Sequence, residues 1–228
     1  MRLHMCCADR MDTTDLELIH TRGYDVRGYW RSDGTLLIRG AVRDELPPGF
    51  YDVDDDVPLV MHHMVVELGV ELPDLVITGV HVDFMAHPHQ ACPHVIDHYQ
   101  GLVGLSIARG FTHKVRELFG GPRGCTHTTA LLQAMAPVAQ QCKRAGMLLG
   151  QRKADSADGP VASPALSSPE MRARRAEGNR NTCHVWAEDG EHFGAILDGS
   201  MSELPIPIAV RIRERGGDPD EWRRQRWD

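Results

Sequence analysis

Leu59-Val60-Met61-His62-His63-Met64-Val65-Val66-Glu67-Leu68-Gly69-Val70 is the stretch that decides the fold, because it alternates in polarity. Alternation predicts a strand with one buried face, which carries His62 among apolar residues. The opposite face carries His63 and Glu67. The strand therefore predicts a sheet covered on one side, with an imidazole on the covered side.

Three further strands are expected around this one. The segments from Thr21 to Trp30 and from Thr35 to Gly40 flank a Ser32-Asp33-Gly34 turn and predict a hairpin. A return strand is expected from Leu75 to Met85. Residues 43–58 are rich in Asp, Pro and Gly and are interpreted as an exposed loop.

Helices are expected after the sheet. Cys92-Pro93 predicts the start of a helix that runs to Ala108, and Phe111 to Phe119 predicts a second, short one. A glycine-rich turn then leads to Cys125, with Thr126 as N-cap of a third helix over 128–143. The sequence thus predicts an α+β fold, an antiparallel sheet of about four strands followed by three helices.

The domain organisation follows from composition. We interpret residues 1–20 as a leader and 21–150 as the α+β core. The Ala-, Ser- and Pro-rich segment 151–178 is interpreted as a linker or partly helical excursion, and 179–228 as a C-terminal extension that packs on the core. Within the extension, Cys183 to Trp186 is expected to form a short strand and 211–228 a solvated tail.

The composition of the 228 residues restricts the partners and the compartment. A net charge of −7 argues against nucleic-acid binding. No apolar run approaches the roughly 20 residues that span a bilayer, and no secretory signal is recognised, so we expect a cytoplasmic protein without a membrane partner. The six cysteines form no disulfide or CxxC spacing and are expected to be reduced. The oligomeric state is left open.

Imidazoles and thiols are concentrated in one segment, since nine of the thirteen histidines lie between His62 and His127. Cys92 and Cys125 each begin an expected helix, where the helix dipole favours a thiolate. His62, Cys92 and Cys125 together predict an open site for a zinc or iron ion. The fourth position is left to His127, His63, His94 or an exogenous group. Each of these side chains has a purely structural alternative as a packed core residue.

The predicted site suggests several functions. A metal-dependent hydrolase or lyase acting on a small catabolic intermediate would use the ion, with His127 or His63 moving the proton. A metal or iron–sulfur carrier is the second hypothesis. The third is a metal-free enzyme with Cys125 as nucleophile and His127 or His62 as base. A structural metal site is the remaining alternative, and Cys183-His184 could close over the site.

The chain also resembles a known family over about residues 20–200. The resemblance rests on Arg31-Ser32-Asp33-Gly34, Tyr24, His62-His63-Met64, Cys92-Pro93, Leu102-Val103-Gly104-Leu105, Gly110-Phe111, Gly124-Cys125-Thr126-His127 and Cys183-His184. These motifs resemble the bacterial domain-of-unknown-function family 2889, whose name implies no activity. The family usually has His-Asp-Met where this chain has His62-His63-Met64.

A more distant resemblance is to the NifU-like iron–sulfur scaffold proteins, which implies a NifU/SufE-like fold. In that class three cysteines and an aspartate hold zinc or a nascent cluster. The resemblance implies that His62, Cys92 and Cys125 stand at the three cysteine positions and Met64 at the aspartate position. With one thiolate replaced by imidazole and the carboxylate lost, a single zinc or iron ion suits this set better than a sulfide cluster.

Overall fold

The computed structural model describes residues 15–108, 110–154, 168–200 and 204–227. The chain divides into two compact units, 1–147 and 148–228. The division falls within one long helix, α2 (Thr126–Ala154). The expected leader lies mostly outside the described residues; its last part, 15–20, is exposed and belongs to no helix or strand.

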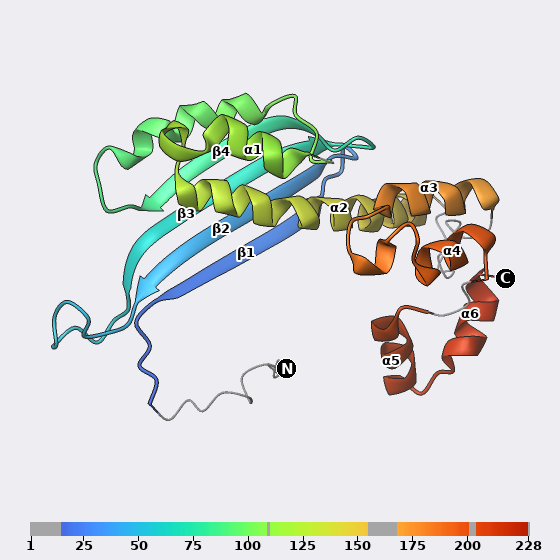
Figure 1. Cartoon of the computed structure of the whole chain (residues 1–228). Helices are drawn as coiled ribbons and strands as arrows, with labels where there is room; N and C mark the ends of the chain where they lie inside the picture. The colour runs from blue at the N-terminus through green and yellow to red at the C-terminus, as the bar shows by residue number, and fades with distance from the viewer. Residues whose placement is uncertain (1–14, 109, 155–167, 201–203, 228) are drawn as a thin grey trace. The chain divides into compact units, whose positions relative to one another are not determined.

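The first unit is built on a four-stranded antiparallel sheet, in the order β1-β2-β3-β4 (Figure 1). The strands are β1 (Thr21–Trp30), β2 (Leu36–Leu46), β3 (Leu59–Glu71) and β4 (Val76–Ala86). The α+β fold with about four antiparallel strands before the helices is therefore confirmed. The NifU/SufE-like assignment stays a prediction.

The alternation of β3 is confirmed. Met64, Val66, Leu68 and Val70 are buried, whereas the residues between them are only partly buried. Because successive side chains of a strand point to opposite faces, this pattern gives the sheet one covered face and one open face.

The expected loop over 43–58 is wrong at its start, because β2 continues past Gly40 to Leu46. The buried positions of this strand are every second residue from Leu36 to Asp44. Pairing with β1 on one side and β3 on the other provides partners for the backbone groups over this length. Asp44 is therefore buried, at a position where the sequence predicted an exposed loop.

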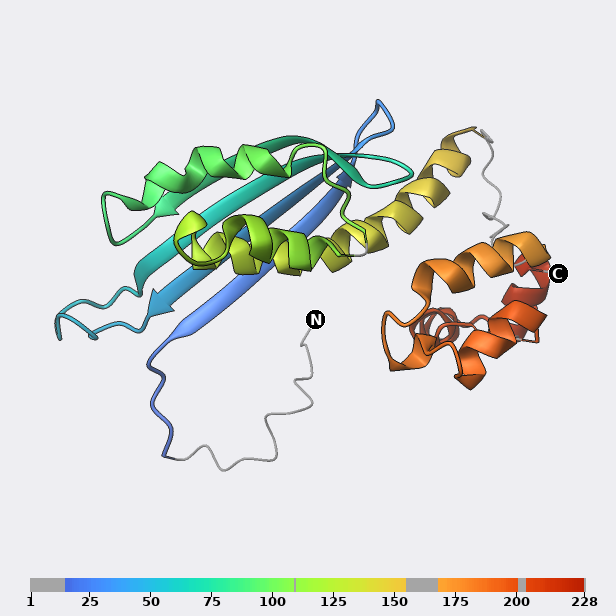
Figure 2. The same cartoon turned by 45° about the horizontal axis from the view of Figure 1, so that its top comes forward.

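Helical segments cover one face of the sheet (Figures 1 and 2). They are η2 (Cys92–Leu102), α1 (Phe111–Phe119), η3 (Gly121–Arg123) and α2. The α1 bounds match the prediction. The expected helix over 93–108 is wrong in type and length, since η2 is a 3₁₀ helix that ends at Leu102.

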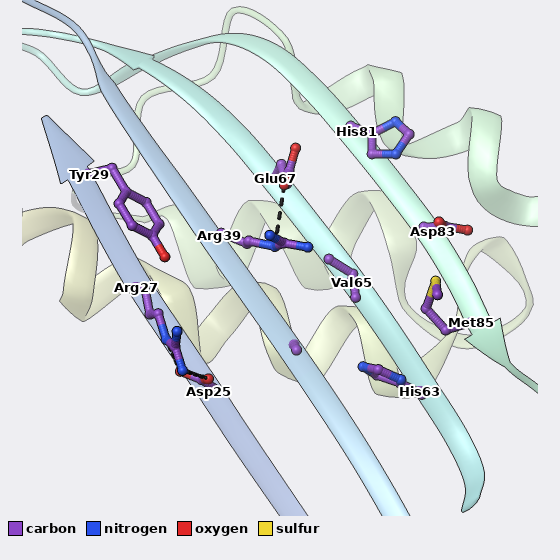
Figure 3. Close-up of a pocket in the computed structure, with 11 residues that line it drawn as sticks. Asp25, Arg27, Tyr29, Arg39, His63, Val65, Glu67, His81, Asp83 and Met85 are labelled. Atoms are coloured by element: carbon purple, nitrogen blue, oxygen red, sulfur yellow. Dashed lines mark hydrogen bonds and ion pairs between the residues drawn. The ribbon is translucent and has the colours of Figure 1, made fainter. Parts of the chain in front are cut away.

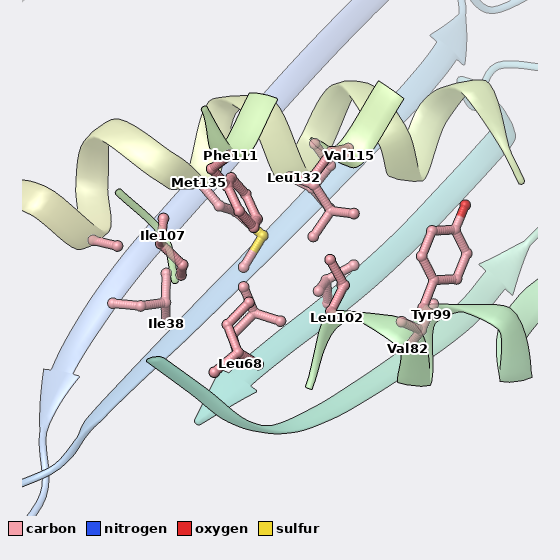
Figure 4. Packing of buried hydrophobic residues seen from close by; sticks show 14 of the residues in the cluster. Ile38, Leu68, Val82, Tyr99, Leu102, Ile107, Phe111, Val115, Leu132 and Met135 are labelled. Atoms are coloured by element: carbon pink, nitrogen blue, oxygen red, sulfur yellow. The ribbon is translucent and has the colours of Figure 1, made fainter. Parts of the chain in front are cut away.

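The core lies between the sheet and these helices (Figure 4). Leu68 of the sheet, Tyr99 and Leu102 of η2, and Leu132 and Met135 of α2 are all fully buried. Their burial removes a large apolar surface from water, which is the main source of stability for such a layer.

The second unit is a small helical assembly. Its helices are α3 (Pro169–Asn179), η5 (His184–Trp186), α4 (Glu191–Asp198), α5 (Ile206–Glu214) and α6 (Pro219–Trp227). Ala176, Phe193 and Ile196 form its buried cluster, against which Trp186 packs. The expected strand at Cys183 to Trp186 is wrong, because a 3₁₀ turn lies there. Most described residues of the expected solvated tail over 211–228 are exposed, as predicted, and the tail is largely helical.

The expected excursion over 151–178 is described only at its ends, in α2 and α3; residues 155–167 lie outside the described residues. The packing of the C-terminal extension on the core stays a prediction.

The close approach of α2 to the sheet at Gly40 gives a first prediction. A Cβ atom at Gly40 would lie 2.7 Å from the sulfur of Met135 and 3.0 Å from a methyl group of Leu131. Gly40→Ala is expected to lower the free energy of unfolding by about 1–3 kcal/mol through overpacking. Urea unfolding measures the loss. Gly79→Ala is the matched control, since nothing lies within 4 Å of its Cβ position, and equal stabilities of the two variants would contradict this packing.

Candidate functional site

A row of three polar side chains crosses the covered face of the sheet near one end. Arg22 on β1 stands opposite Asp44 on β2, and Asp44 stands opposite His62 on β3. Directly opposite residues point to the same face, so the three side chains are neighbours on the helix-covered side.

Asp44 is the centre of this row, and its side chain is only 1% exposed. Arg22 Nε donates a hydrogen bond to Oδ1, and Arg22 Nη2 donates one to Oδ2, both at 2.6 Å. This bidentate contact lowers the pKa of Asp44 below its usual value, although burial opposes the shift. Asp44 is therefore an ionised carboxylate in the folded protein.

Two imidazoles approach the same carboxylate oxygen. His62 Nδ1 lies 3.2 Å and His127 Nε2 lies 3.1 Å from Asp44 Oδ2. The two rings stack with centroids 3.8 Å apart and an angle of 24° between their planes. Burial, and then the neighbouring His62, lower the pKa of His127, which favours the neutral ring.

His62 Nδ1 is buried but has no hydrogen-bond partner among the described residues. Its separation of 3.2 Å from Asp44 is short enough for a hydrogen bond, so the direction of approach is what fails. A buried nitrogen without a partner is costly, which makes this atom the one unexplained polar group of the cluster.

His127 reaches the cluster from the first turn of α2. The preceding turn is held by Tyr99, whose buried Oη accepts a hydrogen bond from the Cys125 backbone N–H at 2.8 Å. Gly124 allows the close packing, since a Cβ there would lie 2.6 Å from the carbonyl oxygen of Phe119. The start of α2 is therefore fixed by contacts with η2 and α1.

Cys125 lies beside the cluster rather than within it. Its Sγ is 3.7 Å from His127 Nδ1, while the other ring nitrogen of His127 approaches Asp44. Cys125, His127 and Asp44 thus form a chain of contacts that runs from a thiol through an imidazole to a carboxylate.

Among the described residues, one group of three His, Cys, Asp or Glu side chains has its ligand atoms all within 4.8 Å of one another: Asp44, His62 and His127. The structure therefore brings together two of the histidines that the sequence singled out. Neither Cys92 nor Cys125 belongs to this group. Cys92 begins η2 and packs against the core instead.

His63 lies on the opposite, open face of the sheet (Figure 3). There it lines a shallow cavity of about 390 Å³, to which Asp25, Arg27, Arg39 and Asp83 also contribute. The sheet separates His63 from the Asp44 carboxylate. Of the two histidines expected to move a proton, His127 lies at the cluster and His63 does not.

Sequence reasoning missed Asp44 and Arg22. The alternation of Leu36 and Ile38 continues through Val42 to Asp44, but Gly40 interrupts it in the sequence. Extending the hairpin from the turn at residues 32–34 would also have set Arg22 opposite Asp44. Arg22 and Asp44 could therefore be found from the register of the hairpin, but not from a local sequence motif.

The fold and the site define an α+β protein with a His, His and Asp cluster beneath its helical layer. The family model "Protein of unknown function (DUF2889)" matches residues 20–141, which is more than half of the chain. The chain therefore belongs to this domain-of-unknown-function family. No protein with a curated description and no solved structure matches the chain.

Two expectations from the sequence concern the cysteines and membrane-spanning segments. The four cysteines among the described residues, Cys92, Cys125, Cys142 and Cys183, are free. None of the described helices has the length and apolarity needed to cross a bilayer.

The role of Tyr99 gives a second prediction. Tyr99→Phe removes the oxygen that accepts the Cys125 N–H and leaves a partly buried donor without its partner. The free energy of unfolding is expected to fall by about 1–3 kcal/mol. Urea unfolding provides the measurement, with the exposed Tyr51→Phe as control. If both variants were as stable as the wild type, the hydrogen bond would not hold the turn.

Proposed function

We propose that this chain is a mononuclear metal protein, a zinc- or iron-dependent hydrolase or lyase, whose ion is held by Asp44, His62 and His127. The observation that carries the proposal is the unpartnered His62 Nδ1, buried within 4.8 Å of two other ligand atoms. A bound cation would give this nitrogen the partner that it lacks.

The separations of the ligand atoms fit such an ion. Two bonds of about 2.0–2.2 Å at a tetrahedral angle place their ligand atoms about 3.3–3.6 Å apart. Both imidazole nitrogens lie 3.1–3.2 Å from Asp44 Oδ2, close to this separation. Because the two rings stack at 24°, one ring must rotate before both nitrogen lone pairs point at the same ion. The protonation states also fit, because metal ligands must be deprotonated and Asp44 and His127 favour that form.

Three protein ligands leave a position for water or for a small-molecule substrate. When bound, an ion of this kind polarises a carbonyl group or lowers the pKa of a bound water. Two histidines and a carboxylate are found with both zinc and non-haem iron, so the donor set supports either metal. The side chains of His62 and His127 remain 22% and 16% exposed, which leaves a path to solvent.

The neighbouring residues would support the ion in different ways. Cys125 Sγ contacts the ring nitrogen of His127 that points away from the cluster, which orients the imidazole. Arg22 orients Asp44 and keeps it ionised, but its own positive charge repels a cation. We therefore expect a weaker affinity than that of a structural zinc site made of cysteines.

A second candidate is a metal-free enzyme with Cys125 as nucleophile. Its support is the chain of contacts from Cys125 Sγ through His127 to Asp44 Oδ2, the order found in cysteine–histidine catalysis. In this case His127 Nε2 would donate its proton to Asp44 instead of binding a metal. A carrier or cluster scaffold has less support, because sulfide clusters are held mainly by thiolates and the three-residue group contains none.

Metal content tests the proposal. Anaerobically purified wild-type protein is expected to contain stoichiometric zinc or iron, and His62→Gln and Asp44→Asn to lose it. The metal is measured by plasma mass spectrometry. His63→Gln is the matched control, one residue away on the other face of β3, and is expected to keep the metal.

Two further variants separate the ligand sets. Cys92→Ser and Cys125→Ser are expected to retain the ion if Asp44, His62 and His127 bind it. Loss of the ion in both serine variants, with retention in Asp44→Asn, would instead support the set of His62, Cys92 and Cys125. Iron accompanied by acid-labile sulfide would support the scaffold role.

The pH dependence of metal affinity follows from the state of His127. Its pKa lies below the ordinary value of about 6.5, so the ring stays neutral until the pH falls below that value. Zinc affinity, measured by competition with a chelator, is therefore expected to be constant near neutral pH and to weaken below about pH 6.5. A steady loss of affinity that begins above neutral pH would contradict these ligands.

Alkylation tests the metal-free candidate. If His127 activates Cys125, the reaction of Cys125 with iodoacetamide is expected to slow in His127→Gln. Cys183, which is exposed, provides a reference thiol in the same molecule. An unchanged ratio of the two rates in metal-free protein would exclude this role of His127.

A further inference from the structure

The two edge strands of the sheet, β1 and β4, differ in their backbone hydrogen bonding. At the β4 edge, Ile77 exchanges backbone hydrogen bonds with Gly104 and Leu105, and the Leu75 carbonyl accepts one from Ile107 N–H, so the beginning of this edge is paired. Among the described residues, β1 makes backbone hydrogen bonds to β2 alone. Most residues of β1 are exposed, and the strand is ten residues long. A long, open edge of this kind is a template for a further strand.

We propose that β1 pairs with β1 of a second copy of this chain, antiparallel, around a two-fold axis at Val26. The two sheets would then form one continuous sheet, with the helices of both copies on the same side. This inference does not depend on the proposed metal site. It rests on the order of charges and glycines along β1.

Symmetry limits the possible registers. A two-fold axis that relates antiparallel edge strands stands perpendicular to the sheet, so each face of one copy continues into the same face of the other. Because side chains alternate between faces, the axis must pass through a residue position. Asp25, Val26 and Arg27 are the central candidates.

Charge selects one of these three registers. An axis at Asp25 would set Asp25 opposite the partner's Asp25, and an axis at Arg27 would set two arginines opposite each other. Like charges that face each other directly destabilise a sheet. An axis at Val26 sets Asp25 opposite the partner's Arg27 twice, once on each side of the axis. In the single chain these two side chains pair with each other at 2.6 Å while both remain more than half exposed.

The same register also joins glycine with tyrosine. An axis at Val26 sets Gly23 opposite the partner's Tyr29, both on the open face. Nothing lies within 4 Å of the Cβ position of Gly23, and Tyr29 is 44% exposed. An aromatic ring that covers a glycine on the neighbouring strand buries apolar surface that otherwise stays exposed to water.

The pairing would also change the open face. Asp25, Arg27 and Tyr29 line the cavity of the open face (Figure 3). With β1 at the centre of a continuous sheet, the cavities of the two copies would lie on either side of the axis and share these residues.

Charge reversal tests the proposal on the full chain. The wild type is expected to be a dimer at tens of micromolar, as measured by sedimentation equilibrium. Asp25→Arg and Arg27→Asp each turn two attractive pairs into two repulsive ones, so each is expected to weaken dimerisation by about 10- to 100-fold. Asp83→Arg, an exposed charge reversal on β4, is the control and is expected to stay dimeric.

Mixing the two variants makes the test specific to the register. A mixture of Asp25→Arg and Arg27→Asp restores both opposite-charge pairs and is expected to form a heterodimer. The double variant Asp25→Arg/Arg27→Asp is expected to be a homodimer again. Circular dichroism confirms that each variant folds. A monomeric wild type, or a dimer that Asp25→Arg and Arg27→Asp leave unchanged, would overturn the proposal.

Discussion

The ion pair between Arg22 and Asp44 is the interaction on which the candidate site depends. A carboxylate with 1% exposure loses nearly all contact with water, and an unpaired charge there would cost several kcal/mol. The two short hydrogen bonds from Arg22 compensate for this loss and keep the charge in place. The ionised oxygen Oδ2 then lies 3.1–3.2 Å from a nitrogen of each imidazole.

The register of the sheet determines which side chains share this environment. Arg22, Asp44 and His62 are opposite each other on three adjacent strands. A slip of one residue between β2 and β3 would move Asp44 next to His63 or Met61 and turn His62 to the open face. The hydrophobic side chains of β3 prevent this slip, because it would expose Met64, Val66 and Leu68 at once. The apolar alternation that forms the core thus also positions the polar cluster.

The sequence allowed this sheet to be predicted, but only part of the site. The alternation around His62 is local, and so are the start and end of α1, which explains why both were found. Cys92 was assigned to an α-helix because its Pro93 neighbour marks a helix start equally well in a 3₁₀ helix. Asp44 was missed since Gly40 interrupts the alternation and the next residues suggest a loop. Its role follows from the register of the strand pairs on either side of it and not from a motif around Asp44 itself.

The two candidate functions make opposite demands on one atom, His127 Nε2. A metal needs the lone pair of this nitrogen, whereas a cysteine–histidine–aspartate relay needs a proton on it to donate to Asp44. His62 distinguishes the two, because a relay has no use for a second imidazole stacked 3.8 Å away with a buried nitrogen lacking a partner. A metal centre uses that nitrogen directly. The arrangement of His62, more than that of Cys125, is therefore why the metal is the better explanation of this cluster.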